Sequence, residues 1–314
     1  MKKLAINTTI RLSLNDATQQ IRMCAERFGL PPILIVQAGP GLPLLHEVTK
    51  FQRRLNLEKN FTVCYWDQRG CGIAPRHDAT SVSLPQQVDD LRAILRWLNN
   101  ETKQTIIVFG ISLGATIALQ AATNEPDIVK TIIAISPDAN IARSDASAAS
   151  FLKEQSAIAN NGRLDAKLMK LGKPPYTDSA TFQLRASMLA DLGGIEHGKR
   201  FGALLRETLF SLISTYGLLG AVHALRNMNR VQNILLPKLV SLNLFSDPPR
   251  LAVPVHYVFG AQDPLIPSDI VKELPVAIST PQSTVKLVSN AGHMVHFDQP
   301  DVVREIVLKA NDGK

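Results

Sequence analysis

The chain has 314 residues and is poor in both cysteine and aromatic side chains. Its three cysteines are too few for a disulfide framework, and phenylalanine, tryptophan and tyrosine together make up 5% of the residues. Glycine and proline, at 18 and 19 residues, follow no periodic spacing, which excludes a collagen-like chain. The cysteine usage is typical of a reducing compartment, so we predict a cytoplasmic protein.

The sequence also has no clear export signal and no convincing membrane span. The basic start at residues 1–3 is followed at once by polar residues between positions 7 and 11, which interrupt any apolar segment of a signal peptide. Residues 104–124 carry no charge and are long enough to span a membrane. The glycines and polar side chains within them favour a buried strand, turn and helix instead. We therefore expect no membrane partner.

Basic residues exceed acidic ones, and the formal net charge is +7. Most of the excess lies between residues 141 and 246, where the basic side chains are scattered singly at helical spacing. A nucleic-acid interface would need a basic stripe with interleaved aromatic side chains, so we expect no nucleic-acid partner. Solvated helix faces explain the charges, and an acidic group on a substrate is the alternative.

Short β-branched runs alternate with helical patterns in the first 140 residues. A capping box at Ser83 and Gln86 introduces an amphipathic helix whose apolar residues recur up to Leu98. The successive strand–helix–strand units predict an α/β fold with a mostly parallel, doubly wound sheet. The predicted strands cover residues 33–36, 61–66, 105–109 and 131–135, and the other predicted helices cover residues 47–55 and 113–122.

After residue 140 the pattern changes to helices alone, over a length far beyond an ordinary connection. Strands at 255–259 and 284–288 and a helix near 302–310 then resume the first rhythm. We predict a core domain formed by residues 1–140 and 248–314, with residues 141–247 inserted late in the chain as a helical unit.

The segment Gly110-Ile111-Ser112-Leu113-Gly114 lies between a predicted strand and a predicted helix. This is the context that a nucleophile elbow of the form G-x-S-x-G requires. The glycines leave room for a side chain on a sharp turn, and the helix start supplies N–H donors for a developing oxyanion. The pattern predicts Ser112 as a nucleophile.

A serine hydroxyl needs a base to take its proton and an acid to orient that base. Asp263 and His293 each follow a strand predicted in the last third of the chain. The carboxyl ends of strands are where sites form in open α/β sheets, and the order Ser, Asp, His is that of α/β-hydrolases. Asp138, behind the strand at 131–135, is the alternative acid, and His296 is the alternative base.

The other histidines show no metal-ligand spacing such as H-E-x-x-H, so we predict neither a metal nor a cofactor. Cys71 is interpreted as a small packing residue, because no histidine pairing identifies it as a thiolate nucleophile.

Two further segments resemble motifs of proline iminopeptidase-like α/β-hydrolases. Gln37-Ala38-Gly39-Pro40-Gly41 looks like the H-G-G-P-G turn, and Asp67-Gln68-Arg69-Gly70-Cys71-Gly72 looks like the D-Q-R-G-x-G segment. The resemblance implies an α/β-hydrolase fold with an oxyanion hole formed by the backbone N–H groups of Gly39 and Leu113. It also implies that residues 141–247 form a cap over the site.

The sequence departs from this family at several positions. Gln37 and Ala38 stand where the family usually has His and Gly. If position 38 required a positive φ, alanine there would add strain on the order of 1 kcal/mol.

The family's W-x-x-W-E stretch, which holds the free amine of the substrate, has no match in this sequence. Loose candidates for an amine anchor are Glu154, Glu196 and Glu207, for which solvated helix-face charges are the alternative. Candidates for the pocket wall are the cap aromatics Phe182, Phe201, Phe210 and Tyr216, for which core packing is the alternative.

These observations predict a cofactor-independent serine hydrolase that cleaves an ester or amide bond through an acyl-enzyme. Its substrate would be a small molecule or a short peptide. The activity would be that of a proline iminopeptidase-like aminopeptidase or of a carboxylesterase, which needs only the triad and an apolar acyl pocket. A non-catalytic ligand-binding receptor on the same fold is the competing hypothesis, left open by the altered turn at Gln37 and Ala38.

Overall fold

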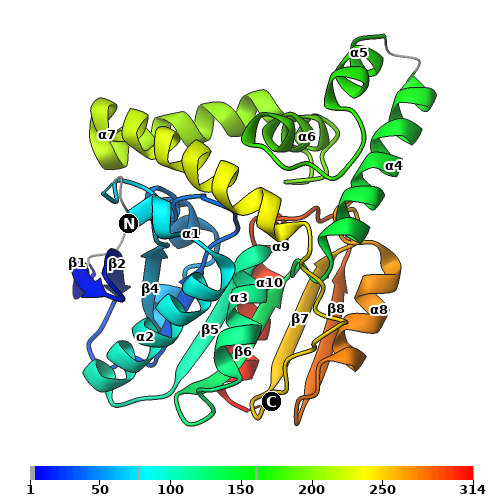
Figure 1. Cartoon of the computed structure of the whole chain (residues 1–314). Helices are drawn as coiled ribbons and strands as arrows, with labels where there is room; N and C mark the ends of the chain where they lie inside the picture. The colour runs from blue at the N-terminus through cyan, green and yellow to red at the C-terminus, as the bar shows by residue number, and fades with distance from the viewer. Residues whose placement is uncertain (1–3, 76–77, 160–161, 314) are drawn as a thin grey trace.

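The computed structural model describes residues 4–75, 78–159 and 162–313. One sheet of eight strands, in the order β1-β2-β4-β3-β5-β6-β7-β8, forms the centre of the molecule (Figure 1). The pairs β1–β2 and β2–β4 are antiparallel, and all the other neighbours are parallel. The strands are β1 (Ile6–Leu14), β2 (Ala17–Ala25), β3 (Pro32–Val36), β4 (Thr62–Asp67), β5 (Ile106–Ile111), β6 (Val129–Ile135), β7 (Val255–Gly260) and β8 (Ser283–Val288).

Helices cover both faces of the sheet, as the sequence predicted. Successive residues of β3 alternate between the two apolar layers, with Leu34 in one and Ile35 in the other. The first layer lies under α2 (Leu84–Thr102), α3 (Leu113–Ala122) and α8 (Ser268–Ala277). The second lies under α1 (Val48–Arg54), α9 (Val295–Asp298) and α10 (Pro300–Asn311). Three short 3₁₀ turns, η1 (Leu45–Glu47), η2 (Leu57–Lys59) and η3 (Asp78–Ser81), complete this part.

The hairpin of β1 and β2 was not among the predicted strands. Its two-residue turn is formed by Asn15 and Asp16, with φ of 50° and 58°, the left-handed conformation that suits a tight hairpin. Most of β1 is exposed and polar, so it has no buried β-branched run of the kind that identified the other strands. The Asn-Asp pair between two alternating segments was the available signal.

Four helices lie across one end of the sheet (Figure 1). They are α4 (Ile141–Ala159), α5 (Gly162–Leu171), α6 (Ser179–Asp191) and α7 (Phe201–Leu239), which agrees with the helical insertion predicted late in the chain. We call residues 141–247 the cap. Part of the cap has its own apolar cluster, which includes Leu152 and Met188, whereas the end of α7 packs into the sheet layer through Val231 and Leu235.

Candidate active site

Ser112 stands in a strained backbone conformation between β5 and α3. Its φ of 53° and ψ of −124° lie outside the regions that L-residues favour. A Cβ atom at Gly110 would lie 2.4 Å from the Cα of Ala115, and one at Gly114 would lie 2.2 Å from the carbonyl oxygen of Val36. Neither position therefore has room for a side chain beside the neighbouring backbone, as the G-x-S-x-G motif predicts.

Asp263 and His293 form a buried pair on the loops that follow β7 and β8 in the chain. The Nδ1 atom of His293 lies 2.7 Å from Oδ2 of Asp263, and Oδ1 of Asp263 accepts a hydrogen bond from the Leu265 N–H at 2.9 Å. A carboxylate only accepts hydrogen bonds, so Nδ1 carries the proton. The Nε2 atom of His293 is thereby left as the proton acceptor.

The surroundings of His293 act on its pKa in opposite directions. Burial disfavours the charged imidazolium and lowers the pKa, whereas the adjacent Asp263 carboxylate, helped by Asp138, favours it. The carboxylates prevail, and the pKa of His293 is raised above its ordinary value.

Asp138, the alternative acid considered from the sequence, contacts the nucleophile and not the base. It follows β6, and its Oδ2 atom accepts a hydrogen bond from the Ser112 hydroxyl at 3.1 Å. Burial raises the pKa of Asp138, although His293 and the Ser112 hydroxyl oppose that shift. In this conformation the serine proton points toward a carboxylate, so the hydroxyl must turn before it can reach His293.

His296, the alternative base, is fully buried among aromatic rings. Its ring stacks on Phe51 with a centroid distance of 5.3 Å and lies 4.1 Å from the ring of Phe297. Neither of its ring nitrogens has a hydrogen-bond partner among the described residues, and burial lowers its pKa well below the ordinary value. His296 is therefore a packing residue, and Asp263 pairs with His293.

The predicted oxyanion turn lies against the start of α3. A Cβ atom at Gly39 would lie 3.0 Å from the side chain of Leu113, so the two predicted N–H donors belong to residues in contact. The Gln37 side chain accepts a hydrogen bond from the Ala38 N–H at 3.1 Å. The positive φ of this turn, 78°, belongs to Gly41 and not to Ala38. The strain considered for Ala38 is therefore absent.

The D-Q-R-G segment holds this turn in place. The Gln68 side chain donates to the carbonyl oxygen of Gln37 at 3.1 Å. Asp67 accepts hydrogen bonds from the Leu45 N–H at 2.9 Å and from the Tyr216 hydroxyl at 2.8 Å. One acidic side chain thus ties the chain behind the oxyanion turn to the cap.

Arg69 of the same segment is fully buried and paired with Asp90 of α2. Its Nε and Nη2 atoms lie 2.7 Å and 2.8 Å from the two carboxylate oxygens, which is the bidentate arrangement. Cys71 is buried as well, and burial raises the pKa of its thiol well above the ordinary value. Its side chain behaves as a small packing group, in line with the prediction.

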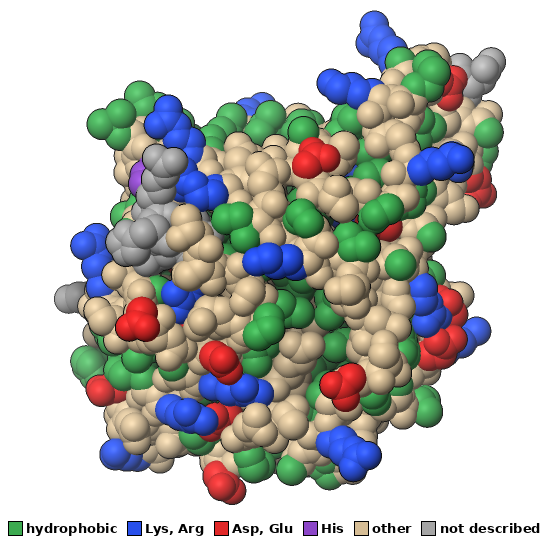
Figure 2. Space-filling model, in the orientation of Figure 1, with side chains coloured by type: hydrophobic (Ala, Val, Ile, Leu, Met, Phe, Trp, Pro, Cys, Tyr) green, Lys and Arg blue, Asp and Glu red, His purple; other side chains and the backbone are tan. Residues whose placement is uncertain are grey.

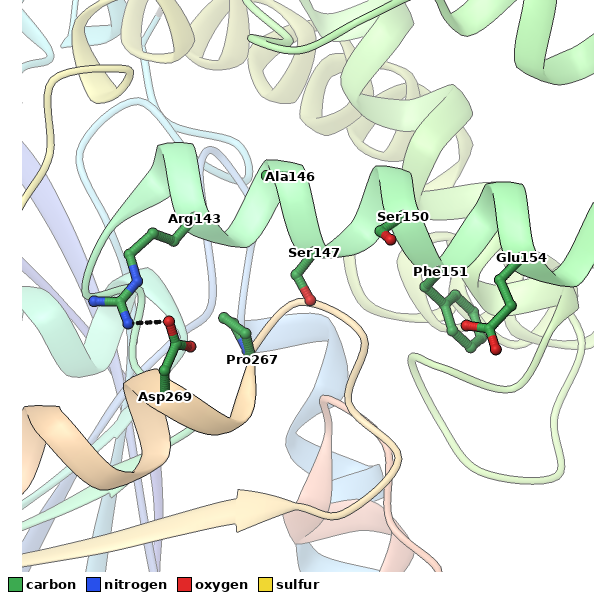
Figure 3. A pocket seen from close by; sticks show the side chains of 8 residues that line it. All are labelled: Arg143, Ala146, Ser147, Ser150, Phe151, Glu154, Pro267 and Asp269. Carbon is green, nitrogen blue, oxygen red and sulfur yellow. Dashed lines mark hydrogen bonds and ion pairs between the residues drawn. The ribbon is translucent and has the colours of Figure 1, made fainter.

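The three candidate amine anchors of the cap are exposed or already paired with cations. Glu196 is buried and pairs with Lys50 and Lys199, whereas Glu207 is exposed and pairs with Lys199 at 2.7 Å. Glu154 is exposed and lines an open groove of about 490 Å³ between α4 and the start of α8. Figure 3 shows it at the opposite end of that groove from the ion pair of Arg143 and Asp269.

The four aromatic candidates for the pocket wall have different surroundings. The ring of Phe182 faces the Arg185 guanidinium at 4.9 Å, and Tyr216 donates its hydroxyl proton to Asp67. Phe201 and Phe210 lie on the outer surface of α7, where Phe210 is 74% exposed. The structure thus gives packing or hydrogen-bond contacts to two of these residues and turns the other two toward solvent.

Arg185 of α6 was not singled out from the sequence. It is buried and forms an ion pair with Asp145 of α4, and its positive charge opposes the rise in the pKa of both Asp138 and His293. Its Nε atom has no hydrogen-bond partner among the described residues. In the sequence it has the spacing of any solvated helix charge, so only the packing of α4 against α6 reveals its burial.

The cap also holds the loop of the base through the main chain. The N–H groups of His293 and Met294 donate to the carbonyl oxygens of Gly194 and Ile195, each at 2.9 Å. The pair Gly193-Gly194 is typical of a helix break in the sequence and gives no sign of this contact. A segment of the cap, about one hundred residues earlier in the chain, therefore fixes the position of His293.

Comparison with known proteins shows which family shares this architecture. A model of the alpha/beta hydrolase fold family matches residues 31–300. The probable aminopeptidase YbaC of Bacillus subtilis (strain 168) is 24% identical over 307 residues, which cover 96% of this chain and 95% of that protein.

Solved structures of different activities share the fold. The proline iminopeptidase-related protein from Thermus thermophilus has a TM-score of 0.66 at 16% identity, over 98% of this chain and 97% of that chain. The epoxide hydrolase CorEH has a TM-score of 0.61 at 17% identity, over 98% and 99%. These similarities establish the architecture. The type of reaction has to be inferred from the residues of the site, because the same fold supports different activities. Since the family model covers most of the chain, this protein belongs to the alpha/beta hydrolase fold family.

Proposed function

We propose that this protein is a serine hydrolase that cleaves an ester or amide bond through an acyl-enzyme intermediate. The observation that carries the proposal is the strained backbone turn at Ser112, held at the same end of the sheet as the Asp263–His293 pair. Strain of this kind persists only where the surrounding structure enforces it, and it is common at active sites.

Acylation begins when the Ser112 hydroxyl turns from Asp138 toward His293. Its oxygen attacks the carbonyl carbon of the substrate, and its proton passes to Nε2 of His293. Asp263 stabilises the imidazolium that forms, and the N–H groups of Gly39 and Leu113 bind the oxyanion of the tetrahedral intermediate. The imidazolium then protonates the leaving alcohol or amine, and the acyl group stays on Ser112.

Deacylation repeats these steps with water as the nucleophile. His293 removes a proton from the water, whose oxygen attacks the acyl carbonyl. The second tetrahedral intermediate collapses to release the carboxylic acid, and the proton returns to Ser112. No step of this sequence calls on a metal or cofactor.

Two kinds of substrate fit this chemistry. The likeness to the probable aminopeptidase YbaC and the motifs shared with proline iminopeptidases favour an amide with a free amine. The state of the cap glutamates favours a carboxylesterase, because Glu196 and Glu207 are paired with lysines and Glu154 is exposed. Hydrolysis of short acyl esters alone, in a panel that also contains proline arylamides, would exclude the aminopeptidase.

A fluorophosphonate probe tests the nucleophile directly. We expect one covalent adduct on the wild-type protein, seen by intact mass, and none on Ser112→Ala, because the probe needs an activated serine. Thermal unfolding of both proteins serves as the folding control. A folded wild-type protein that takes up no label would contradict the serine hydrolase and favour the receptor.

A further inference from the structure

The long helix α7 bends sharply at Gly217, whose φ of 71° and ψ of 173° are not helical. We call residues 206–226 the elbow. A Cβ atom at Gly217 would meet nothing within 4 Å, so the bend lies in open space. In Figure 1 it is the outer corner of the cap, at the upper left.

Large apolar side chains gather on the outside of this elbow. Phe210 is 74% exposed, Leu218 67% and Leu219 86%, and Ile213 and Val222 are also exposed. The inner side of the elbow has its own small cluster, which includes Leu212 and Ala224. Because that cluster packs the two limbs together, the outer side chains are not needed to close the fold.

Basic side chains accompany the exposed apolar ones. Arg206 lies one turn before Phe210, and Arg226 lies one turn after Val222, so each shares a helix face with apolar residues of the elbow. Both arginines are exposed, and neither forms an ion pair with a described residue. Figure 2 shows hydrophobic side chains protruding at this corner with basic ones beside them.

The elbow is short of negative charge. Glu207 is the acidic residue of α7, and it pairs with Lys199. A second copy of the chain, docked about a two-fold axis, would bring this basic surface against an equally basic one, without acidic side chains to pair with Arg206 and Arg226. An anionic partner instead satisfies both the apolar and the basic side chains.

The helix does not cross a membrane, although it has the composition to do so. Among the described residues, α7 alone is long and apolar enough for a span, and 17% of its most apolar window is buried. The end of α7, however, packs into the sheet layer through Val231, Leu235 and Leu239. A helix anchored in this way at one end of the fold can lie on a lipid surface but cannot traverse it.

We propose that the elbow of α7 is a docking surface for an anionic lipid membrane. Phe210, Leu218 and Leu219 enter the headgroup region, and Arg206 and Arg226 contact the lipid phosphates. Exposed apolar side chains flanked by arginine suit such an interface, since the long arginine stem follows the apolar layer while its charge stays at the headgroups. The expectation of no membrane partner rested on the lack of an export signal and on residues 104–124, most of which are buried in the core, and it did not concern the elbow.

The test is sedimentation of the full chain with lipid vesicles. We expect wild-type protein to bind vesicles of phosphatidylcholine mixed with phosphatidylglycerol, to bind pure phosphatidylcholine weakly, and to lose binding as salt is raised. The double variant Leu218→Ser/Leu219→Ser should reduce the vesicle partition coefficient by about tenfold or more. Arg206→Gln/Arg226→Gln should remove most of the salt-dependent part.

The matched control is a double variant that removes two exposed apolar side chains elsewhere on the surface. Phe28 and Val276 are 77% and 84% exposed, so Phe28→Ser/Val276→Ser should bind vesicles as the wild type does. The proposal is overturned if wild-type protein ignores phosphatidylglycerol vesicles, or if this control loses as much binding. It is also overturned if light scattering shows a dimer that Leu218→Ser/Leu219→Ser dissociates. A third contrary result is that soluble polyglutamate binds the wild type and Leu218→Ser/Leu219→Ser equally and prevents vesicle binding.

The fluorophosphonate reaction separates this proposal from the proposed function. Ser112 should be labelled at the same rate in the elbow variants and the wild type in the absence of vesicles. Loss of vesicle binding with unchanged labelling therefore concerns the elbow alone.

Discussion

At the scale of the residue, His293 is the group on which the proposed chemistry depends most. Only the neutral imidazole can accept the serine proton. Because Asp263 and Asp138 raise the pKa of His293 against the effect of burial, the protonated form persists to higher pH than in an ordinary histidine. The rate must fall as the pH drops through this raised pKa.

We predict that kcat/KM on a neutral ester declines on the acid side with a midpoint above about 6.5, the ordinary histidine value. Asp263→Asn should lower the rate by roughly 10³–10⁴-fold, since the imidazole loses its orientation. It should also move the acid limb to lower pH, because burial then outweighs the remaining charge. A pH–rate profile of both proteins measures this, and a rate that stays flat from about pH 5 to 8 would contradict the role of His293.

The position of Asp138 shows what sequence reasoning leaves open at this scale. The chain order predicted Ser112, Asp263 and His293 as the catalytic candidates, because each lies at a strand end with a recognisable neighbour. Asp138 also lies at a strand end, and its contact with Ser112 instead of His293 depends on side-chain rotamers and on the spacing between β5, β6 and β7. No local pattern encodes those distances.

At the scale of the element, the turn after β4 is joined to α2 by the pair of Arg69 and Asp90. The two side chains are 2% and 0% exposed, so neither charge has water to replace its partner. Removing one member of such a pair leaves a buried charge without compensation.

We predict that Asp90→Asn lowers the free energy of unfolding by about 3–5 kcal/mol. Arg69→Met combined with Asp90→Leu should cost less, because no charge then stays buried. Asp89→Asn next to it is the control, since the Asp89 carboxylate is 58% exposed and its pair with Arg92 should contribute less than about 1 kcal/mol. Urea unfolding compares the four proteins, and equal losses for Asp89→Asn and Asp90→Asn would refute the argument.

Most elements of the core were predictable because burial leaves a strong signal. The strands β3 to β7 are runs of buried residues, and they begin and end within two residues of the predicted bounds. The helix α8 was missed, since it is short, contains Pro275 and buries only Ile270 and Leu274. An element that buries so few residues has little periodicity to detect.

At the scale of the whole molecule, the cap and the core meet at the loop that carries the base. The carbonyl oxygen of Gly194 accepts a hydrogen bond from the N–H group of His293, and a Cβ atom at Gly194 would lie 2.7 Å from Cγ of Pro264. Pro264 directly follows Asp263. Gly194 therefore touches the loops of both the base and its acid, and the position of the cap determines their alignment.

We predict that Gly194→Ala slows fluorophosphonate labelling of Ser112 by about tenfold or more, because the added methyl group displaces the loops of Asp263 and His293. The matched control is Gly202→Ala in the same cap, where a Cβ atom meets nothing within 4 Å and alanine favours the helix. The control should label at the wild-type rate and unfold at the same or a higher temperature. If both variants label at the wild-type rate while staying folded, the cap does not position the base, and the contact at Gly194 serves only to close the fold.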